Sequence, residues 1–118
     1  MKKIVINTCF GGFGLSHEAI MMYSEIAKLN LLAVKSEHFS LCGYNYYLDG
    51  IQEDEYFWSE YEIGRDDPDL VAVVELLGEK ANGHAAELKV VSIPDGVEWF
   101  IHEYDGIEHV AEKHRTWN

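Results

Sequence analysis

The segment at residues 9–16 contains the residues best suited to bind an anion. It holds three glycines in four positions: Gly11, Gly12 and Gly14. Backbone N–H groups in a glycine loop, at the positive end of a helix dipole, suit a phosphate. Ser16 could add a hydroxyl donor, and Phe10 and Phe13 could stack on a ring. A tight structural connection explains the same glycines equally well, since the loop is neither a Walker loop nor Gly-x-Gly-x-x-Gly.

The basic segment at residues 113–117 is a second candidate for ligand binding. It carries Lys113, Arg115 and Trp117 at the end of an otherwise acidic chain. The planar guanidinium of Arg115 fits a phosphate, and the Trp117 ring offers a stacking face. The alternative is a solvated tail whose tryptophan packs back on the domain.

The stretch from residue 44 to residue 69 combines aromatic and acidic side chains. Its aromatic residues are Tyr44, Tyr46, Tyr47, Tyr56, Phe57, Trp58 and Tyr61. Nine acidic residues lie from position 49 to position 69, and Arg65 is the single basic residue in this range. Aromatic anchors with a charged rim are typical of interfaces, and dense acids can imitate a DNA backbone. A strand that is half core and half solvated is the alternative.

Motifs for metal binding and catalysis are weak. His102 and His109 are expected opposite each other on a hairpin, where two imidazoles could ligate a metal. No third ligand is evident, so structural histidines are favoured and we assign neither metal nor cofactor. No Gly-x-Ser-x-Gly or His-Glu-x-x-His motif occurs. Cys9 could be an activated thiol, but no histidine is tied to it by spacing, so a binding protein is favoured over an enzyme.

Composition excludes several classes of function. The chain has 118 residues, is 47% hydrophobic and carries a net charge of −12, which fits one domain over 1–118. This charge argues against general binding to nucleic acid and to anionic lipid. No apolar run could span a membrane, and Ile4–Ile6 is too short for an export signal, so we expect a cytoplasmic protein. Cys9 and Cys42 are expected to be free thiols.

These candidates must be positioned by the elements around them. Patterning predicts strands over residues 2–8, 31–34, 44–48, 87–93, 97–104 and 107–116, and helices over 17–30 and from 68 to about 82. Residues 49–69 are expected to form an exposed strand or a long loop. Asp105-Gly106 predicts a hairpin that places Tyr104 opposite Ile107. The segment from Ile107 onward also fits a helix.

Helix boundaries follow from capping residues. Ser16 and Asp67 suit N-caps, Pro68 suits the first helical position, and Asn82-Gly83 is a stop signal. The predicted fold is therefore α+β: a mainly antiparallel sheet with two helices, in the order β-α-β-β-α-β-β-β.

Three longer motifs carry a resemblance. They are KIVINTCFGGFGLS at residues 3–16, RDDPDLV at residues 65–71 and EKHRTW at residues 112–117. With them the chain resembles a mostly uncharacterised family of small phage- and prophage-encoded proteins. The resemblance implies action in the cytoplasm of a bacterial host. By analogy of class, it implies either a sponge that sequesters a nucleotide defence signal or an acidic inhibitor of a host enzyme.

The leading hypothesis is binding, without turnover, of a phosphorylated nucleotide-like ligand. The residues assigned to it are Gly11, Gly12, Gly14 and Ser16 for the phosphate, Phe13 and Trp117 for stacking, and Arg65 and Arg115 for charge neutralisation. The alternative is an acidic interaction protein or DNA mimic that inhibits a host nuclease or another DNA-binding enzyme. An enzyme acting on nucleotides ranks third. Because the aromatic content exceeds what a small core needs, we expect a homo-oligomer.

Overall fold

A computed structural model describes residues 1–35 and 43–112, and it confirms the α+β class and the predicted order of elements. The strands are β1 (Lys2–Asn7), β2 (Leu31–Lys35), β3 (Tyr44–Leu48), β4 (Phe57–Trp58), β5 (Leu88–Ile93), β6 (Trp99–Tyr104) and β7 (Ile107–Glu112). The helices are α1 (His17–Ile26) and α2 (Pro68–Leu77), with 3-10 turns η1 (Asp54–Tyr56), η2 (Glu60–Glu62) and η3 (Gly78–Ala81). Strand β4 lies inside the stretch that was expected to be an exposed strand or a long loop.

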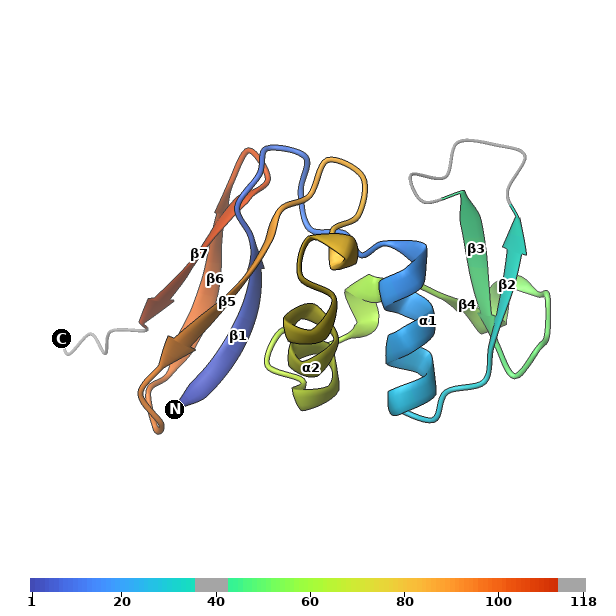
Figure 1. Ribbon diagram of the computed structural model, residues 1–118, viewed down its shortest axis with the longest axis horizontal. Coiled ribbons are helices and arrows are strands. Elements are labelled where there is room, and N and C mark those ends of the chain that lie inside the picture. Colours follow the sequence, from blue (N-terminus) through green and yellow to red (C-terminus); the bar gives the residue numbers. More distant parts are fainter. Residues whose placement is uncertain (36–42, 113–118) are drawn as a thin grey trace, which may run out of the picture.

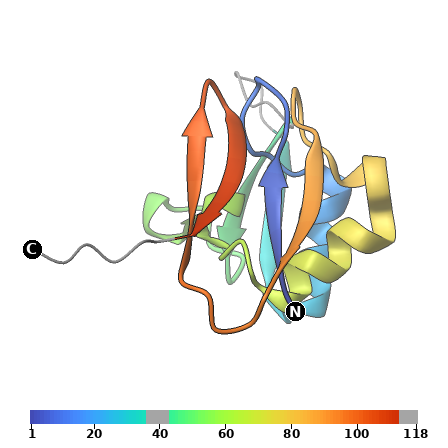
Figure 2. The same ribbon diagram turned by 90° about the vertical axis from the view of Figure 1, so that its left-hand side faces the viewer.

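The strands form three antiparallel sheets rather than one. Strand β1 pairs with β5, β2–β3–β4 form a second sheet, and β6 pairs with β7. Helices α1 and α2 lie between the β1–β5 pair and the β2–β3–β4 sheet (Figure 1). On the outer side, β6, β7, β1 and β5 stand side by side (Figure 2). The two helices therefore separate the sheets, and they supply seven of the fourteen residues of the buried core cluster.

The buried residues of both helices recur at helical spacing. Buried helix residues are Ala19, Ile20, Tyr23 and Ser24 in α1, and Leu70, Val71, Val73 and Val74 in α2. Burial of one such aliphatic side chain stabilises the fold by roughly 1.5–3 kcal/mol. Ile26 has the helical spacing of Ile20 and Tyr23, but it is exposed because α1 ends there. In the described part of the chain, no helix is both long and apolar enough to cross a bilayer.

Helix starts were predicted more accurately than helix ends. The Ser16 hydroxyl caps α1 and the Asp67 carboxylate caps α2, as expected. Helix α2 ends at Leu77 rather than near residue 82, because Gly78 takes a φ of 57° that interrupts the helix. Asn82 follows η3, and its side-chain oxygen accepts a hydrogen bond from the amide of Leu88, the first residue of β5, at 2.9 Å.

The C-terminal hairpin has the predicted register. Tyr104 pairs with Ile107 and His102 with His109, so residues 107–112 are a strand and not a helix. Asp105 and Gly106 both have positive φ, which is the requirement of a two-residue type I′ turn.

Candidate functional site

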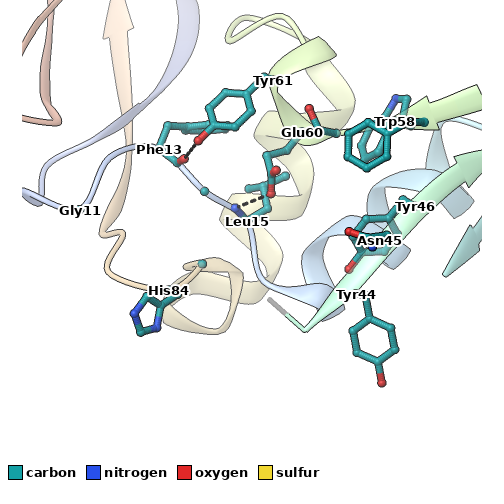
Figure 3. A pocket seen from close by; sticks show the side chains of 14 residues that line it. Gly11, Phe13, Leu15, Tyr44, Asn45, Tyr46, Trp58, Glu60, Tyr61 and His84 are labelled. Atoms are coloured by element: carbon teal, nitrogen blue, oxygen red, sulfur yellow. Dashed lines mark hydrogen bonds between the residues drawn. The ribbon is translucent and has the colours of Figure 1, made fainter. Parts of the chain in front are cut away.

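A cavity of about 320 Å³ opens beside the glycine loop. One side is the loop itself, and the other is formed by aromatic residues of β3, β4 and η2 (Figure 3). Its lining residues are Gly11, Phe13, Gly14, Leu15, Tyr44, Asn45, Tyr46, Phe57, Trp58, Ser59, Glu60, Tyr61, Gly83 and His84. The fold thus joins two candidates that are separate in the sequence, the glycine loop and the aromatic-acidic stretch.

Glycine is required in the loop and in the neighbouring turn of the hairpin β6–β7, where backbone segments touch. A Cβ on Gly11 would lie 2.0 Å from the Ala85 carbonyl oxygen, and a Cβ on Gly106 would lie 2.4 Å from the Phe10 carbonyl oxygen. Gly12 has space around it but adopts a φ of +88°, which favours glycine. The tight-connection interpretation therefore accounts for Gly11 and Gly12 without a ligand.

Two donors near the start of α1 are engaged by protein groups. The Leu15 amide donates to Oε2 of Glu60 at 3.3 Å. The Ser16 hydroxyl accepts from the Ala19 amide (3.1 Å) and donates to the Lys80 carbonyl (2.6 Å). The Glu60 carboxylate thus occupies a position that a phosphate would take in a phosphate-binding loop.

Arg65 forms an ion pair with Glu108, which we call the clasp. Nη1 and Nη2 of Arg65 donate to Oε1 and Oε2 of Glu108 at 2.6 and 2.8 Å. The two side chains are only 18% and 8% exposed, and the guanidinium lies 3.7 Å from the centre of the Phe13 ring. A two-bond guanidinium–carboxylate pair is among the stronger side-chain contacts. The positive charge of Arg65 is therefore neutralised within the protein.

The clasp also closes the free edge of β1. The Val5 amide donates to the Arg65 carbonyl at 2.8 Å, and the Asn7 amide donates to Oε1 of Glu108 at 2.8 Å. The fully buried Asn7 side chain adds bonds to the carbonyls of Cys9 and Gly106 at 2.6 and 2.7 Å. Side chains, rather than a backbone ladder, thus join the hairpin β6–β7 to β1 and to the start of the glycine loop.

The aromatic wall of the cavity has a buried base and an exposed rim. Tyr46 and Trp58 are buried and meet edge to face, with ring centres 6.4 Å apart. Tyr61 and Phe57 are 69% and 50% exposed. The Tyr61 hydroxyl donates to the Phe13 carbonyl at 3.0 Å, so it ties the rim to the glycine loop (Figure 3).

Charge inside the cavity is negative. No lysine or arginine stands among the described residues that line it, whereas Glu60 contributes a carboxylate. A carboxylate accepts hydrogen bonds and donates none, so the cavity is suited to a ligand that carries N–H or O–H donors. No protein-family model, curated protein or solved structure matches this chain.

The structure brings only part of the proposed phosphate set to the cavity. Gly11, Phe13 and Gly14 line it, whereas Gly12 and Ser16 do not and Arg65 forms the clasp. The remaining two residues of the set, Arg115 and Trp117, lie outside the described residues, as does Cys42.

Sequence reasoning did not assign Glu60, Tyr61 or His84 to a ligand site. The unusual density of aromatic and acidic residues did mark the stretch that holds Glu60 and Tyr61. No local spacing connects this stretch to the glycine loop, because Leu15 and Glu60 are 45 positions apart.

The histidine pair of the hairpin is solvent-exposed. His102 and His109 face each other across β6 and β7, and both side chains are open to solvent. Within residues 1–35 and 43–112, no group of three or more potential metal ligands occurs.

Proposed function

We propose that this protein binds, without chemical turnover, a small nucleotide-like ligand whose flat ring lies in the cavity beside the glycine loop. The observation that carries the proposal is the cavity itself. Its volume of about 320 Å³ and its aromatic lining with a few polar groups are typical of small-molecule sites. Stacking of one base on an aromatic side chain contributes about 1–3 kcal/mol, so the exposed Tyr61 ring would supply much of the affinity.

The ring, rather than the phosphate, is the part of the ligand that the described residues support. The Leu15 amide already donates a hydrogen bond to Glu60, and the Ser16 hydroxyl already caps α1. A phosphate contact would depend on Arg115, which lies outside the described residues. The proposal therefore places ring recognition in the cavity and leaves phosphate recognition as a secondary feature.

The resemblance to phage proteins gives this binding a biological setting. In the cytoplasm of an infected bacterium, a protein that holds a nucleotide-like defence signal would lower its free concentration. Binding alone is sufficient for this role. A homo-oligomer fits the same proposal, since Phe100 and Tyr104 are exposed on the hairpin β6–β7 and would be covered by another copy.

Two tyrosines of similar exposure provide a matched test. Tyr61 lines the cavity and is 69% exposed, whereas Tyr104 lies on the hairpin β6–β7 and is 72% exposed. Calorimetric titration with nucleosides and nucleoside monophosphates should detect binding to the wild type. We expect Tyr61→Ala to weaken it about tenfold, the value of one stacking contact. Tyr104→Ala should leave it unchanged. Equal effects of the two changes, or no binding, would contradict the proposal.

An acidic interaction protein is the second candidate, and the exposed acids favour it. The exposed acids between residues 49 and 69 are Asp49, Glu53, Asp54, Glu55, Glu62 and Asp66. The rings of Phe57 and Tyr61, in the same stretch of the chain, are exposed as well. A DNA mimic should inhibit DNA-cleaving enzymes in a salt-dependent manner. Reversing Asp54 and Glu55 to lysine should abolish inhibition, whereas Glu25→Lys on α1 should not.

A further inference from the structure

Glu60 contributes a carboxylate to the lining of the cavity. It is the first residue of η2, and its side chain points toward the glycine loop (Figure 3). Oε2 accepts one hydrogen bond, from the Leu15 amide at 3.3 Å. Oε1 accepts none from the residues that the structure describes. Because two carboxylate oxygens offer about four acceptor positions, Glu60 has most of its capacity unused.

A carboxylate with free acceptor positions in a partly enclosed aromatic cavity favours ligands that carry hydrogen-bond donors. A charge removed from water is costly unless hydrogen bonds replace those to the solvent. The lining supplies no lysine or arginine to do so. A ligand that presents two N–H donors on one edge would satisfy both oxygens, whereas a ligand that presents an acceptor there would be repelled.

We infer that Glu60 reads the edge of a guanine-type ring, an inference that rests on the proposed function. Guanine presents two neighbouring donors on its pairing edge, the N1–H and the 2-amino group. Adenine and cytosine each present one donor beside an acceptor nitrogen, and uracil presents one N–H between two carbonyls. Guanine alone among the common bases therefore matches a carboxylate with two bonds, while its faces lie against the exposed rings of Phe57 and Tyr61.

The same geometry makes the ring, and not the phosphate, the source of affinity. A phosphate adds negative charge to a ligand bound beside Glu60 in a protein of net charge −12. Like charges repel, so guanosine should bind as tightly as its 5′-monophosphate or more tightly.

Nucleoside analogues test the inference on the wild-type protein. Calorimetric titration should show guanosine binding about tenfold more tightly than inosine, which lacks the 2-amino group, and than adenosine, since a two-bond contact discriminates strongly. A methyl group on N1 of guanosine should cause a similar loss. Equal affinities for guanosine, inosine and adenosine would overturn the inference.

Variants of η2 assign the selectivity to one residue. In Glu60→Gln, one oxygen still accepts the Leu15 N–H, so the fold is kept, but the amide NH₂ faces the donors of guanine. We expect this variant to lose its preference for guanosine over inosine. The control is Glu62→Gln, which changes an exposed glutamate of the same 3-10 turn that does not line the cavity. A preference that survives in Glu60→Gln would overturn the inference.

The outcomes separate this inference from the proposed function. If all nucleosides bind equally and Tyr61→Ala weakens them all, the cavity binds flat rings without Glu60 reading their edges. If no nucleoside or nucleotide binds, both statements are wrong. If Glu60→Gln fails to fold, the analogue series on the wild type decides alone.

Discussion

Glu108 and Glu60 are both acceptors of backbone N–H groups, but they differ in how many hydrogen bonds their carboxylates make within the protein. Glu108 is 8% exposed, bonds to both terminal nitrogens of Arg65 and also accepts from the Asn7 amide. Glu60 accepts a single backbone N–H at 3.3 Å and lines a cavity without lysine or arginine among its described residues. The Glu108 carboxylate thus holds elements of the fold together. The Glu60 carboxylate keeps acceptor positions that no described residue fills.

The same contrast separates the residues that are conspicuous in the sequence from those that form the cavity. In the sequence, Gly11 and Arg65 resemble parts of a phosphate site. In the structure, Ala85 fills the space beside Gly11, and Glu108 neutralises the charge of Arg65. The acidic-aromatic stretch, in contrast, supplies the open carboxylate and the exposed rings. The proposed site therefore rests on a group with unfilled hydrogen-bonding capacity and not on the glycine motif.

The largest expected effect concerns the clasp. Glu108→Gln leaves the largely buried Arg65 charge unpaired, so the free energy of unfolding should fall by about 3 kcal/mol. Urea denaturation measures this change. Glu112→Gln, on an exposed residue of the same strand, is the control and should change it by less than about 0.5 kcal/mol. If both variants lose the same stability, the Arg65–Glu108 pair does not stabilise the fold.

Two glycines of the loop should differ in their tolerance of a methyl group. Gly11→Ala places a Cβ 2.0 Å from the Ala85 carbonyl oxygen, and the resulting shift should cost about 2 kcal/mol. Gly14→Ala meets nothing nearer than the Gly83 Cα at 3.9 Å, so its stability should stay close to that of the wild type. Thermal unfolding of both variants measures the difference. Equal melting temperatures would show that the loop can move away from residue 85.

A smaller effect is expected at Tyr23, which links α1 to the cap of α2. Its hydroxyl donates to Oδ2 of Asp67 at 2.8 Å, so Tyr23→Phe should cost about 1 kcal/mol at neutral pH. Burial raises the pKa of this hydroxyl well above the ordinary value, and the Asp67 hydrogen bond and charge raise it further.

The pH dependence at Tyr23 follows from this direction. In the unfolded chain the hydroxyl ionises near pH 10, while in the folded protein it stays protonated. Its stabilising contribution is therefore complete below pH 10 and is lost as the pH rises further. Denaturation at pH 8 and pH 11 should show the wild type losing more stability than Tyr23→Phe. Parallel losses would contradict the role of this hydroxyl.

The smallest effect on stability is expected at the rim of the cavity. Phe57 is half exposed, so Phe57→Ala should change the free energy of unfolding by less than about 0.5 kcal/mol. Ligand affinity should nevertheless fall about fivefold, because the ring is part of the cavity lining. Leu76→Ala on α2, also exposed, should affect neither quantity. If Phe57→Ala lowered the stability but not the ligand affinity, Phe57 would have a structural role and no role in binding.

Local signals predicted much of the fold. Ser16 and Asp67 were recognised as caps, because a cap depends on a few neighbouring residues. The register of β6 and β7 followed from Asp105-Gly106, since a two-residue turn fixes which residues face each other. The division into three sheets was missed, because it depends on how distant segments pack.

Long-range contacts account for what was missed in the site. Arg65 and Glu108 are 43 positions apart, and their pairing leaves no trace in local spacing. Glu60 is one of nine acids in its stretch, and only the fold shows that it meets Leu15 across the cavity. Composition therefore indicated a segment that lines the cavity, whereas the choice of one carboxylate among nine required the three-dimensional arrangement.

A titration of ¹⁵N-labelled protein with guanosine, followed by amide chemical shifts, tests directly whether the ring binds beside Glu60. The Leu15 amide is the decisive reporter, because it donates to the carboxylate that is proposed to read the ring. We predict the largest shifts at Leu15, at Trp58 and at Tyr61, with small shifts in the hairpin β6–β7. Shifts confined to the hairpin, or an unchanged Leu15 amide at saturation, would contradict the assignment of this cavity as the ligand site.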